Sequence, residues 1–243
     1  MGQEHKHRVL LTGDGQSTES ATQLLEFIGC LAVTLAAEDK AADMLRETAP
    51  DLVLLAVSSV HDPGIALCRA MRSVSGVPII VLVGRGTEQA CVDCLTAGAD
   101  DFITKPSSSA VLGARIEAVI RRANADSYHA TSEAFRCFPP SEGVLRVGNV
   151  RLDLTTCRVT VNGTVRTLTP NEFRLLAIFM RAPGDVFTRE DLRRRVWPDD
   201  QHSLHLVEVH IANLRAKIEA DPHHPAYIVT VRSRGYKFAA LSG

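Results

Sequence analysis

The chain has 243 residues, of which 45% are hydrophobic, and a formal net charge of −1. This length and apolar content provide for one large domain or two ordinary ones with packed cores. The sequence has no run of 18 apolar residues and no cleavable signal pattern, so we expect a soluble, cytoplasmic protein with no membrane partner. The near-neutral total hides an asymmetry, since residues 1–140 hold 12 basic and 17 acidic side chains and residues 141–243 hold 15 and 11. An acidic front and a basic back fit a regulatory module joined to one that binds a polyanion.

Residues 1–123 alternate short apolar runs with helical patterns. The pattern predicts strands at 8–12, 31–35, 51–57, 77–83 and 101–104, and helices at 18–29, 38–48, 63–74, 87–97 and 109–122. Ser20-Ala21-Thr22-Gln23 is a candidate cap or extension at the start of the first helix. Strands that are continuously apolar and alternate with helices predict a parallel sheet covered on both faces. We therefore expect an α/β domain, a flavodoxin-like doubly wound five-stranded sheet, with its functional end at the carboxyl edge of the strands.

Residues 124–142 are polar and end in two prolines, so we interpret them as a linker. The second domain, 143–243, begins with four short strands expected at 143–147, 150–154, 157–161 and 164–168. Helices are predicted at 170–182, after a proline at the first turn, and at 189–196, with Thr188 as cap. Residues 204–238 indicate an amphipathic helix, a short loop and a β-hairpin that carries Arg232, Arg234 and Lys237.

The helix within 204–238 has two stripes. The first is apolar and is expected to face the core; it consists of Val207, Ile211, Leu214 and Ile218. The second is offset by one residue and mostly polar; it consists of Leu206, Val209, His210, Asn213 and Lys217. A helix that packs on one side and offers short polar groups on the other fits a DNA major groove, and a basic hairpin beside it fits phosphates or the minor groove.

Six cysteines are scattered along the chain, which favours reduced thiols in a cytosolic protein. Cys91 and Cys94 form a CxxC pair inside a helical pattern, and we interpret them as two small helix residues. A redox or metal role is the alternative, although one pair cannot complete a four-ligand zinc site. We expect no metal and no cofactor.

Several spaced motifs resemble the winged-helix effector domain of OmpR/PhoB-type response regulators. They are Leu168-Thr169-Pro170-Asn171-Glu172-Phe173, Val186-Phe187-Thr188-Arg189-Glu190-Asp191-Leu192, Val196-Trp197, Val207-Glu208-Val209-His210-Ile211, Leu214-Arg215-Ala216-Lys217, Thr230-Val231-Arg232 and Gly235-Tyr236-Lys237-Phe238. The resemblance extends over nearly the whole chain, including a receiver-like first half. It implies a two-component response regulator with an α+β winged helix-turn-helix domain that binds double-stranded DNA and RNA polymerase.

The resemblance also implies which side chains contact DNA. The matching positions are Arg189, Trp197, His205, Val209, His210, Asn213, Arg215, Thr230, Arg232, Arg234 and Tyr236. Relatives commonly carry Arg where this chain has Ala212 and Asn213. Because Asn reads adenine whereas Arg prefers guanine, an adenine is the expected contact of Asn213. A core anchor is the alternative role for Trp197, and solvated surface is the alternative for the arginines.

The receiver-like half departs from the family pattern where phosphoryl transfer takes place. In that family a carboxylate attacks the phosphoryl group, and Mg²⁺ bridges further acids. The corresponding positions here are Gly13, Asp14, Ala56, Val83 and Lys105. We therefore expect no aspartyl phosphorylation. Ser58 and Ser59 lie nearby, but neither is placed as the family nucleophile is.

Two roles remain open for Lys105. One is a structural ion pair with Asp14. The other is a ligand-sensing pocket formed by Gly13, Asp14, Ala56, Val83 and Lys105, with a small molecule as the possible ligand.

Receivers of this family dimerise through the fourth helix, the fifth strand and the fifth helix. Asp101 and Arg115 stand where an ion pair across the dimer is expected, and Cys91 and Val111 would form a small apolar contact. The complete expected face is Cys91, Asp100, Asp101, Val111, Arg115 and Arg122. Solvated surface charges are the alternative.

Together these patterns predict a sequence-specific DNA-binding transcriptional regulator that is independent of phosphorylation and acts as a homodimer on two half-sites. No catalysis is expected. The alternatives are a ligand-sensing regulator and a conventional phospho-relay regulator with a non-standard acceptor.

Overall fold

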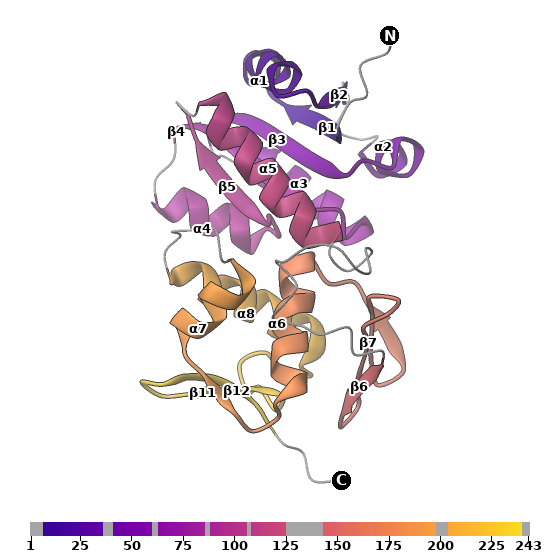
Figure 1. Cartoon of the computed structure of the whole chain (residues 1–243), viewed down its shortest axis with the longest axis vertical. Coiled ribbons are helices and arrows are strands. Elements are labelled where there is room, and N and C mark those ends of the chain that lie inside the picture. The colour runs from indigo at the N-terminus through magenta and orange to yellow at the C-terminus, as the bar shows by residue number, and fades with distance from the viewer. Residues whose placement is uncertain are drawn as a thin grey trace. The chain divides into compact units, whose positions relative to one another are not determined.

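A computed structural model describes residues 7–35, 41–59, 63–85, 88–105, 108–124, 143–197 and 204–239. The chain divides into two compact units, Met1–Arg121 and Arg122–Gly243 (Figure 1). Residues 125–142, nearly all of the expected linker, lie outside the described residues.

The first unit is a five-stranded parallel sheet in the order β2-β1-β3-β4-β5. Its strands are β1 (Arg8–Gly13), β2 (Leu31–Thr34), β3 (Leu52–Ser59), β4 (Ile79–Arg85) and β5 (Asp101–Thr104). Its helices are α1 (Gly15–Phe27), α2 (Ala41–Thr48), α3 (Pro63–Val74), α4 (Glu88–Thr96) and α5 (Ser109–Asn124). The predicted doubly wound fold of this unit is confirmed.

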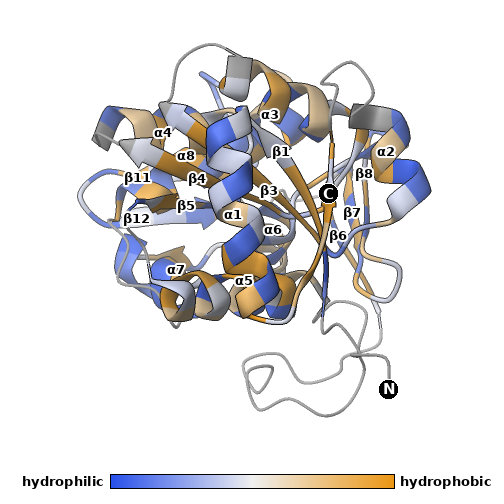
Figure 2. Cartoon of the chain, turned by 90° about the horizontal axis from the view of Figure 1, so that it is seen from above, coloured by the Kyte–Doolittle hydropathy of each residue, from blue (hydrophilic) through white to orange (hydrophobic). Residues whose placement is uncertain are grey.

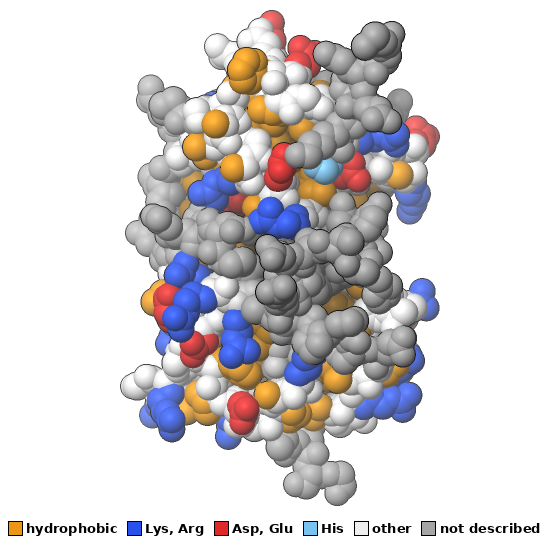
Figure 3. Space-filling view, viewed as in Figure 1, with side chains coloured by type: hydrophobic (Ala, Val, Ile, Leu, Met, Phe, Trp, Pro, Cys, Tyr) orange, Lys and Arg blue, Asp and Glu red, His pale blue; other side chains and the backbone are white. Residues whose placement is uncertain are grey.

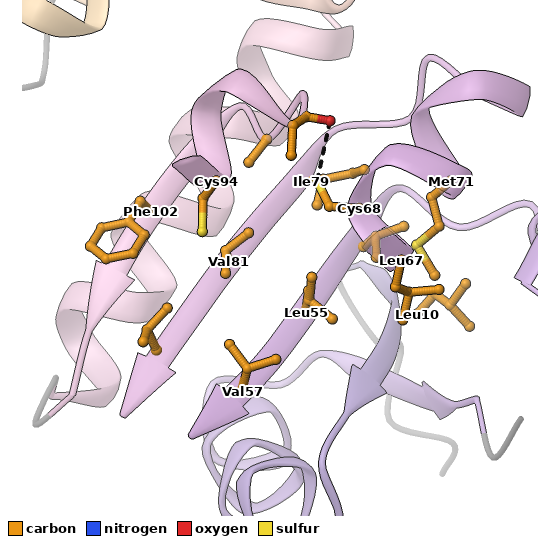
Figure 4. Packing of buried hydrophobic residues seen from close by; sticks show 14 of the residues in the cluster. Leu10, Leu55, Val57, Leu67, Cys68, Met71, Ile79, Val81, Cys94 and Phe102 are labelled. Carbon is orange, nitrogen blue, oxygen red and sulfur yellow. Dashed lines mark hydrogen bonds between the residues drawn. The ribbon is translucent and has the colours of Figure 1, made fainter. Parts of the chain in front are cut away.

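The core of this unit lies on both faces of the sheet, because its central strands are apolar at successive positions. Leu52, Leu54 and Ala56 belong to one buried cluster, and Val53 and Leu55 belong to the other. Figure 2 shows the apolar colour concentrated along the strands, and Figure 4 shows side chains of the cluster that α3 and α4 cover.

Helix α1 begins earlier than predicted. It starts at Gly15, and the Asp14 carboxylate caps it by accepting a hydrogen bond from the Ser17 amide at 2.9 Å. The expected cap or extension at Ser20 is wrong, because a carboxylate one residue before the helix already satisfies an otherwise unpaired amide of the first turn.

The buried side chain of Arg72 forms hydrogen bonds that link the end of α3, the start of β4 and the loop before β5. Arg72 donates to the carbonyls of Gly98 at 2.9 Å and Val77 at 2.7 Å, and to the Asp100 carboxylate at 2.7 Å. Asp100 also accepts from the Ile79 amide at 3.0 Å. The Arg72 guanidinium can be buried here because carbonyls accept its hydrogen bonds and the Asp100 carboxylate balances its charge.

The second unit has a four-stranded antiparallel sheet, three helices and a three-stranded sheet. The first sheet has the order β6-β7-β8-β9: β6 (Val144–Val147), β7 (Val150–Asp153), β8 (Arg158–Val161) and β9 (Thr164–Arg166). The helices are α6 (Pro170–Arg181), α7 (Arg189–Val196) and α8 (His205–Ile218). The second sheet has the order β10-β12-β11: β10 (Val186–Phe187), β12 (Gly235–Phe238) and β11 (Ile228–Val231). The predicted α+β winged helix-turn-helix fold is confirmed.

Local sequence signals explain most boundaries in this unit. Asn162 and Gly163 have φ values of 51° and 77°, as a type I′ turn between β8 and β9 requires. Thr169 and Thr188 each begin a capping box, with Glu172 and Asp191 as the reciprocal partners.

Strand β10 was not predicted, because a strand of two residues shows no alternation. It pairs with β12, with Phe187 opposite Tyr236, and so attaches the C-terminal hairpin to the turn before α7. Gly235 makes this pairing possible, since its φ is 138° and an added Cβ would lie 2.0 Å from the Phe187 carbonyl oxygen.

Gly235→Ala should destabilise the second unit by about 2–4 kcal/mol, because it adds both a backbone clash and an unfavourable φ. Thermal unfolding of the full chain measures the loss. Gly163→Ala is the matched control. Its φ is also positive, at 77°, but no atom lies within 4 Å of the added Cβ. The expected loss of stability is therefore only about 1 kcal/mol. Equal losses for the two variants would contradict the role of the close approach.

Candidate nucleic-acid interface

The expected core stripe of α8 is buried. Val207, Ile211, Leu214 and Ile218 lie in the interior, and α8 packs against α6 and α7. This packing fixes how the remaining faces of the helix are presented.

The second stripe is not the exposed face that its sequence suggested. His210 is only 1% exposed, and Leu206 and Val209 are also buried. The His210 ring packs on Trp197, with ring centroids 5.1 Å apart, and Trp197 is itself fully buried at the end of α7. The expected exposure of Val209 and His210 is therefore wrong, and the burial of Trp197 agrees with its alternative role as a core anchor. One reason is geometric: a stripe one residue from the core stripe is rotated by about 100°, which leaves part of it within the packed face.

Lys217 of the same stripe is partly exposed, and its ammonium is bound to a buried carboxylate. Its ammonium lies 2.6 Å from the Glu172 carboxylate, which also accepts the Thr169 amide in the capping box of α6. A buried carboxylate needs such a partner, so this lysine serves packing.

The exposed positions of α8 are His205, Ala212 and Ala216, with Glu208, Asn213 and Arg215 partly exposed. Arg215 donates from Nε and Nη2 to the Ile228 carbonyl at 2.9 and 2.6 Å, and from Nη2 to Thr230 Oγ1 at 2.8 Å. Burial lowers the pKa of Arg215, but a guanidinium stays protonated in proteins. Arg215 therefore fixes α8 to β11.

Tyr236 lies between two guanidinium groups. The Arg189 group is 5.4 Å from the ring centroid and the Arg215 group is 5.6 Å from it. Tyr236 is buried, so its expected exposure is wrong, because the two arginines and the pairing of β12 with β10 enclose it.

At the start of α7, Arg189 Nε donates to Glu208 Oε1 at 2.6 Å, and His205 Nδ1 lies 3.1 Å from Glu208 Oε2. Burial would raise the pKa of Glu208, but the hydrogen bonds from Arg189 and His205 hold it below its ordinary value. The carboxylate is thus charged at neutral pH.

The turn between β11 and β12 presents Arg232 and Arg234 to solvent, and Thr230 is also exposed. On the face shown in Figure 3, Lys and Arg side chains gather over the second unit. The polar and basic groups of α7, α8 and the hairpin form one surface with the chemistry of a DNA-binding site.

In the first unit the backbones of β1 and β3 lie in close contact at the carboxyl end of the sheet. The Asp14 amide donates to the Ala56 carbonyl at 3.1 Å, and a Cβ on Gly13, whose φ is 137°, would lie 1.7 Å from that oxygen. Ala56 and Val83 are fully buried.

The Asp14 carboxylate is satisfied by serines. It accepts the Ser17 amide at 2.9 Å, the Ser58 amide at 2.5 Å and the Ser58 hydroxyl at 2.7 Å. Burial opposes its charge, but these hydrogen bonds hold the pKa of Asp14 below its ordinary value. Within the described part of the chain no ion pair joins Asp14 to Lys105, so the expected pair is wrong: Ser58 has taken its place.

Comparison with known proteins agrees with this division. Residues 13–117 match the family described as response regulator receiver domain, and residues 163–238 match transcriptional regulatory protein, C terminal. The DNA-binding response regulator MtrA of Mycobacterium tuberculosis is 38% identical over 237 residues, covering 96% of this chain and 96% of MtrA. The chain belongs to the OmpR/PhoB-type response regulators. Its relatives are DNA-binding transcriptional regulators.

Two further similar proteins support the same family assignment. The sensory transduction protein RegX3 of Mycobacterium bovis is 43% identical over 188 residues, covering 77% of this chain and 78% of RegX3. A solved structure of a RitR mutant is 25% identical, with a TM-score of 0.71, and covers 96% of this response regulator and 98% of that chain. No helix in the described residues is long and apolar enough to cross a membrane.

The face of α4, β5 and α5 in this response regulator differs from the expected dimer face. Asp101 is 2% exposed and forms an ion pair with the partly exposed Arg115 at 3.1 Å within the chain, so the expected place of Asp101 on the surface is wrong. Asp100 is 2% exposed and bound to Arg72, so its expected place on the surface is wrong, because it neutralises a buried arginine. Val111 is exposed, Cys91 packs partly buried against the core, and the side chain of Arg122 lies outside the described residues.

Two residues contribute to these sites although the sequence does not predict their roles. Glu208 lies inside a matched motif, but an acid on a DNA-facing surface has no recognisable sequence signal. Ser58 is expected only as a possible phosphate acceptor, whereas it donates to Asp14.

Proposed function

We propose that this response regulator binds specific DNA sites without aspartyl phosphorylation, as a homodimer that contacts RNA polymerase. One observation carries the first part: the Gly13 backbone closes against the Ala56 carbonyl while Asp14 is occupied by Ser17 and Ser58. Phosphoryl transfer needs a nucleophilic carboxylate and a cation held by several oxygens. Ala56 supplies no nucleophile, and Asp14 offers one carboxylate that already accepts three hydrogen bonds.

Incubation of the full chain with a small phosphodonor and Mg²⁺ should leave its intact mass unchanged. The double variant Gly13→Asp/Ala56→Asp should also stay unmodified, because any Cβ at position 13 meets the carbonyl at position 56. A gain of roughly 80 Da on the natural chain would contradict the proposal. The same gain on the double variant alone would contradict only the argument from the backbone.

The proposed DNA contacts are made by α7, α8 and the hairpin. Arg189, His205, Asn213, Arg215, Thr230, Arg232 and Arg234 contact bases or phosphates, and Trp197, Val209, His210 and Tyr236 support them from within. The partial exposure of Asn213 on α8 and the exposed arginines of the hairpin support this assignment. Asn213 reads adenine through N6 and N7.

Asn213→Ala should relax the preference at one base of a site selected from a random duplex library. The expected loss at that base is about 1–3 kcal/mol, with little change on duplexes that lack the preferred base. Ala212→Ser, on the exposed neighbouring position, serves as the control and should leave the selected sequence unchanged. Equal losses on all sequences after Asn213→Ala would refute base reading.

The proposed dimer uses α4, β5 and α5. Exposed Val111 and the partly exposed Arg115 beside Asp101 provide an apolar contact and a charge pair. Because the Asp101–Arg115 pair already exists within one chain, a partner can share it without a phosphate signal.

Arg115→Glu places a like charge beside Asp101 and should shift sedimentation toward the monomer and weaken DNA binding, since such juxtaposition costs several kcal/mol. Arg46→Glu, on exposed α2, is the control and should leave both unchanged. Unchanged sedimentation after Arg115→Glu would show that dimers form elsewhere.

A ligand-sensing pocket at Gly13, Asp14, Ala56, Val83 and Lys105 is a second candidate. One observation favours it: the ammonium of the partly buried Lys105 forms no ion pair with the described residues. An anionic small molecule is the matching ligand.

A further inference from the structure

Three elements of the DNA-facing surface meet at Arg189, at the start of α7. Its Nε donates to Glu208 on α8, and its guanidinium lies over the Tyr236 ring on β12. The Tyr236 ring also contacts Arg215, which donates hydrogen bonds to Ile228 and Thr230 on β11. The position of one arginine is therefore set by two other elements.

The contact with Glu208 uses one edge of the guanidinium. Glu208 Oε1 lies 2.6 Å from Nε, and the Tyr236 ring packs against the guanidinium with its centroid 5.4 Å from the guanidinium carbon. The guanidinium also has a side-chain hydrogen bond with Tyr236, and the Nη donors that these two partners leave can meet a phosphate oxygen. The second Glu208 oxygen is held by His205 at 3.1 Å, which restrains the carboxylate itself.

We propose that Glu208 is a positioning residue for DNA binding: it holds Arg189 Nε so that the Nη donors meet a backbone phosphate. The proposal rests on the proposed phosphate contact of Arg189. A fixed guanidinium loses less side-chain entropy on binding, which offsets the repulsion between the carboxylate and DNA.

This role predicts an effect opposite in sign to simple electrostatics. Removal of an acid from a surface that faces a polyanion should strengthen binding if the acid only repels DNA. If Glu208 positions Arg189, its removal weakens binding although the protein becomes more positive.

The experiment measures the affinity of full-length Glu208→Gln for a fluorescent duplex of mixed sequence over a range of salt concentrations. We expect affinity to fall by about 3- to 10-fold, and the slope of log K against log salt to fall by about 0.9, the equivalent of one phosphate. A purely structural role would lower the unfolding temperature without changing this slope. Unchanged or tighter binding overturns the proposal.

Glu190→Gln is the matched control. Glu190 lies beside Arg189 in sequence and its side chain is 47% exposed, against 40% for Glu208, but it binds Arg193 instead. The same charge is lost without disturbing Arg189, so binding should not weaken. Equal weakening in both variants overturns the proposal.

The variant Arg189→Ala separates the proposed phosphate contact of Arg189 from the proposed positioning role of Glu208. If Arg189→Ala leaves affinity and salt slope unchanged, the proposed phosphate contact of Arg189 fails, and the role of Glu208 fails with it. If Arg189→Ala weakens binding and Glu208→Gln does not, only the positioning role fails. In the Arg189→Ala background, Glu208→Gln should cause no further loss, and an additive loss overturns the proposal.

Discussion

The parallel pairing of β1 with β3 brings the Gly13 backbone against the Ala56 carbonyl, and the chemistry of the first unit depends on this approach. At the carboxyl edge of a doubly wound sheet, two strand ends normally frame a ligand site. Here the Gly13 backbone lies directly against the Ala56 carbonyl, and the one remaining acid, Asp14, caps α1. Asp14 illustrates how a residue in a family position can change role: its oxygens organise α1 and Ser58 instead of a metal. Ala56 and Val83 are apolar and fully buried, so they belong to the core of this unit.

In the second unit the surface for DNA is assembled by internal contacts. Tyr236 is enclosed by two arginines, and the hairpin is attached to the turn before α7 through Phe187. Because these contacts already exist in the free protein, little conformational entropy is lost in ordering α7, α8 and the hairpin when DNA binds. The arrangement also explains why buried residues such as His210 and Trp197 can matter without touching DNA, since they set the angle at which α8 is presented.

Sequence patterns predicted whole elements well where burial is continuous. The bounds of α3, α7 and β5 agree with prediction, because local signals specify them: an apolar run for β5, spaced apolar residues for α3, and the Thr188 cap for α7. Prediction failed where a partner distant in sequence decides the outcome. Asp100 resembles a surface charge until Arg72, 28 residues away, is found beside it. His210 resembles a polar groove residue until Trp197 covers it, and β10 exists only because β12 pairs with it. Periodicity describes one helix or strand, whereas these contacts belong to the tertiary structure.

Arg72 has a mechanical consequence for the edge of the first sheet. By binding three carbonyls and a carboxylate, it cross-links the end of α3, the start of β4 and the loop that leads into β5. Local opening of that edge would expose a buried guanidinium and several acceptors together, so the three segments should exchange their amide hydrogens as one cooperative unit. The protein surface formed by this edge of the sheet therefore has the same conformation before and after a partner binds. Any signal that acts on this regulator must therefore move the edge as a rigid body or leave it in place.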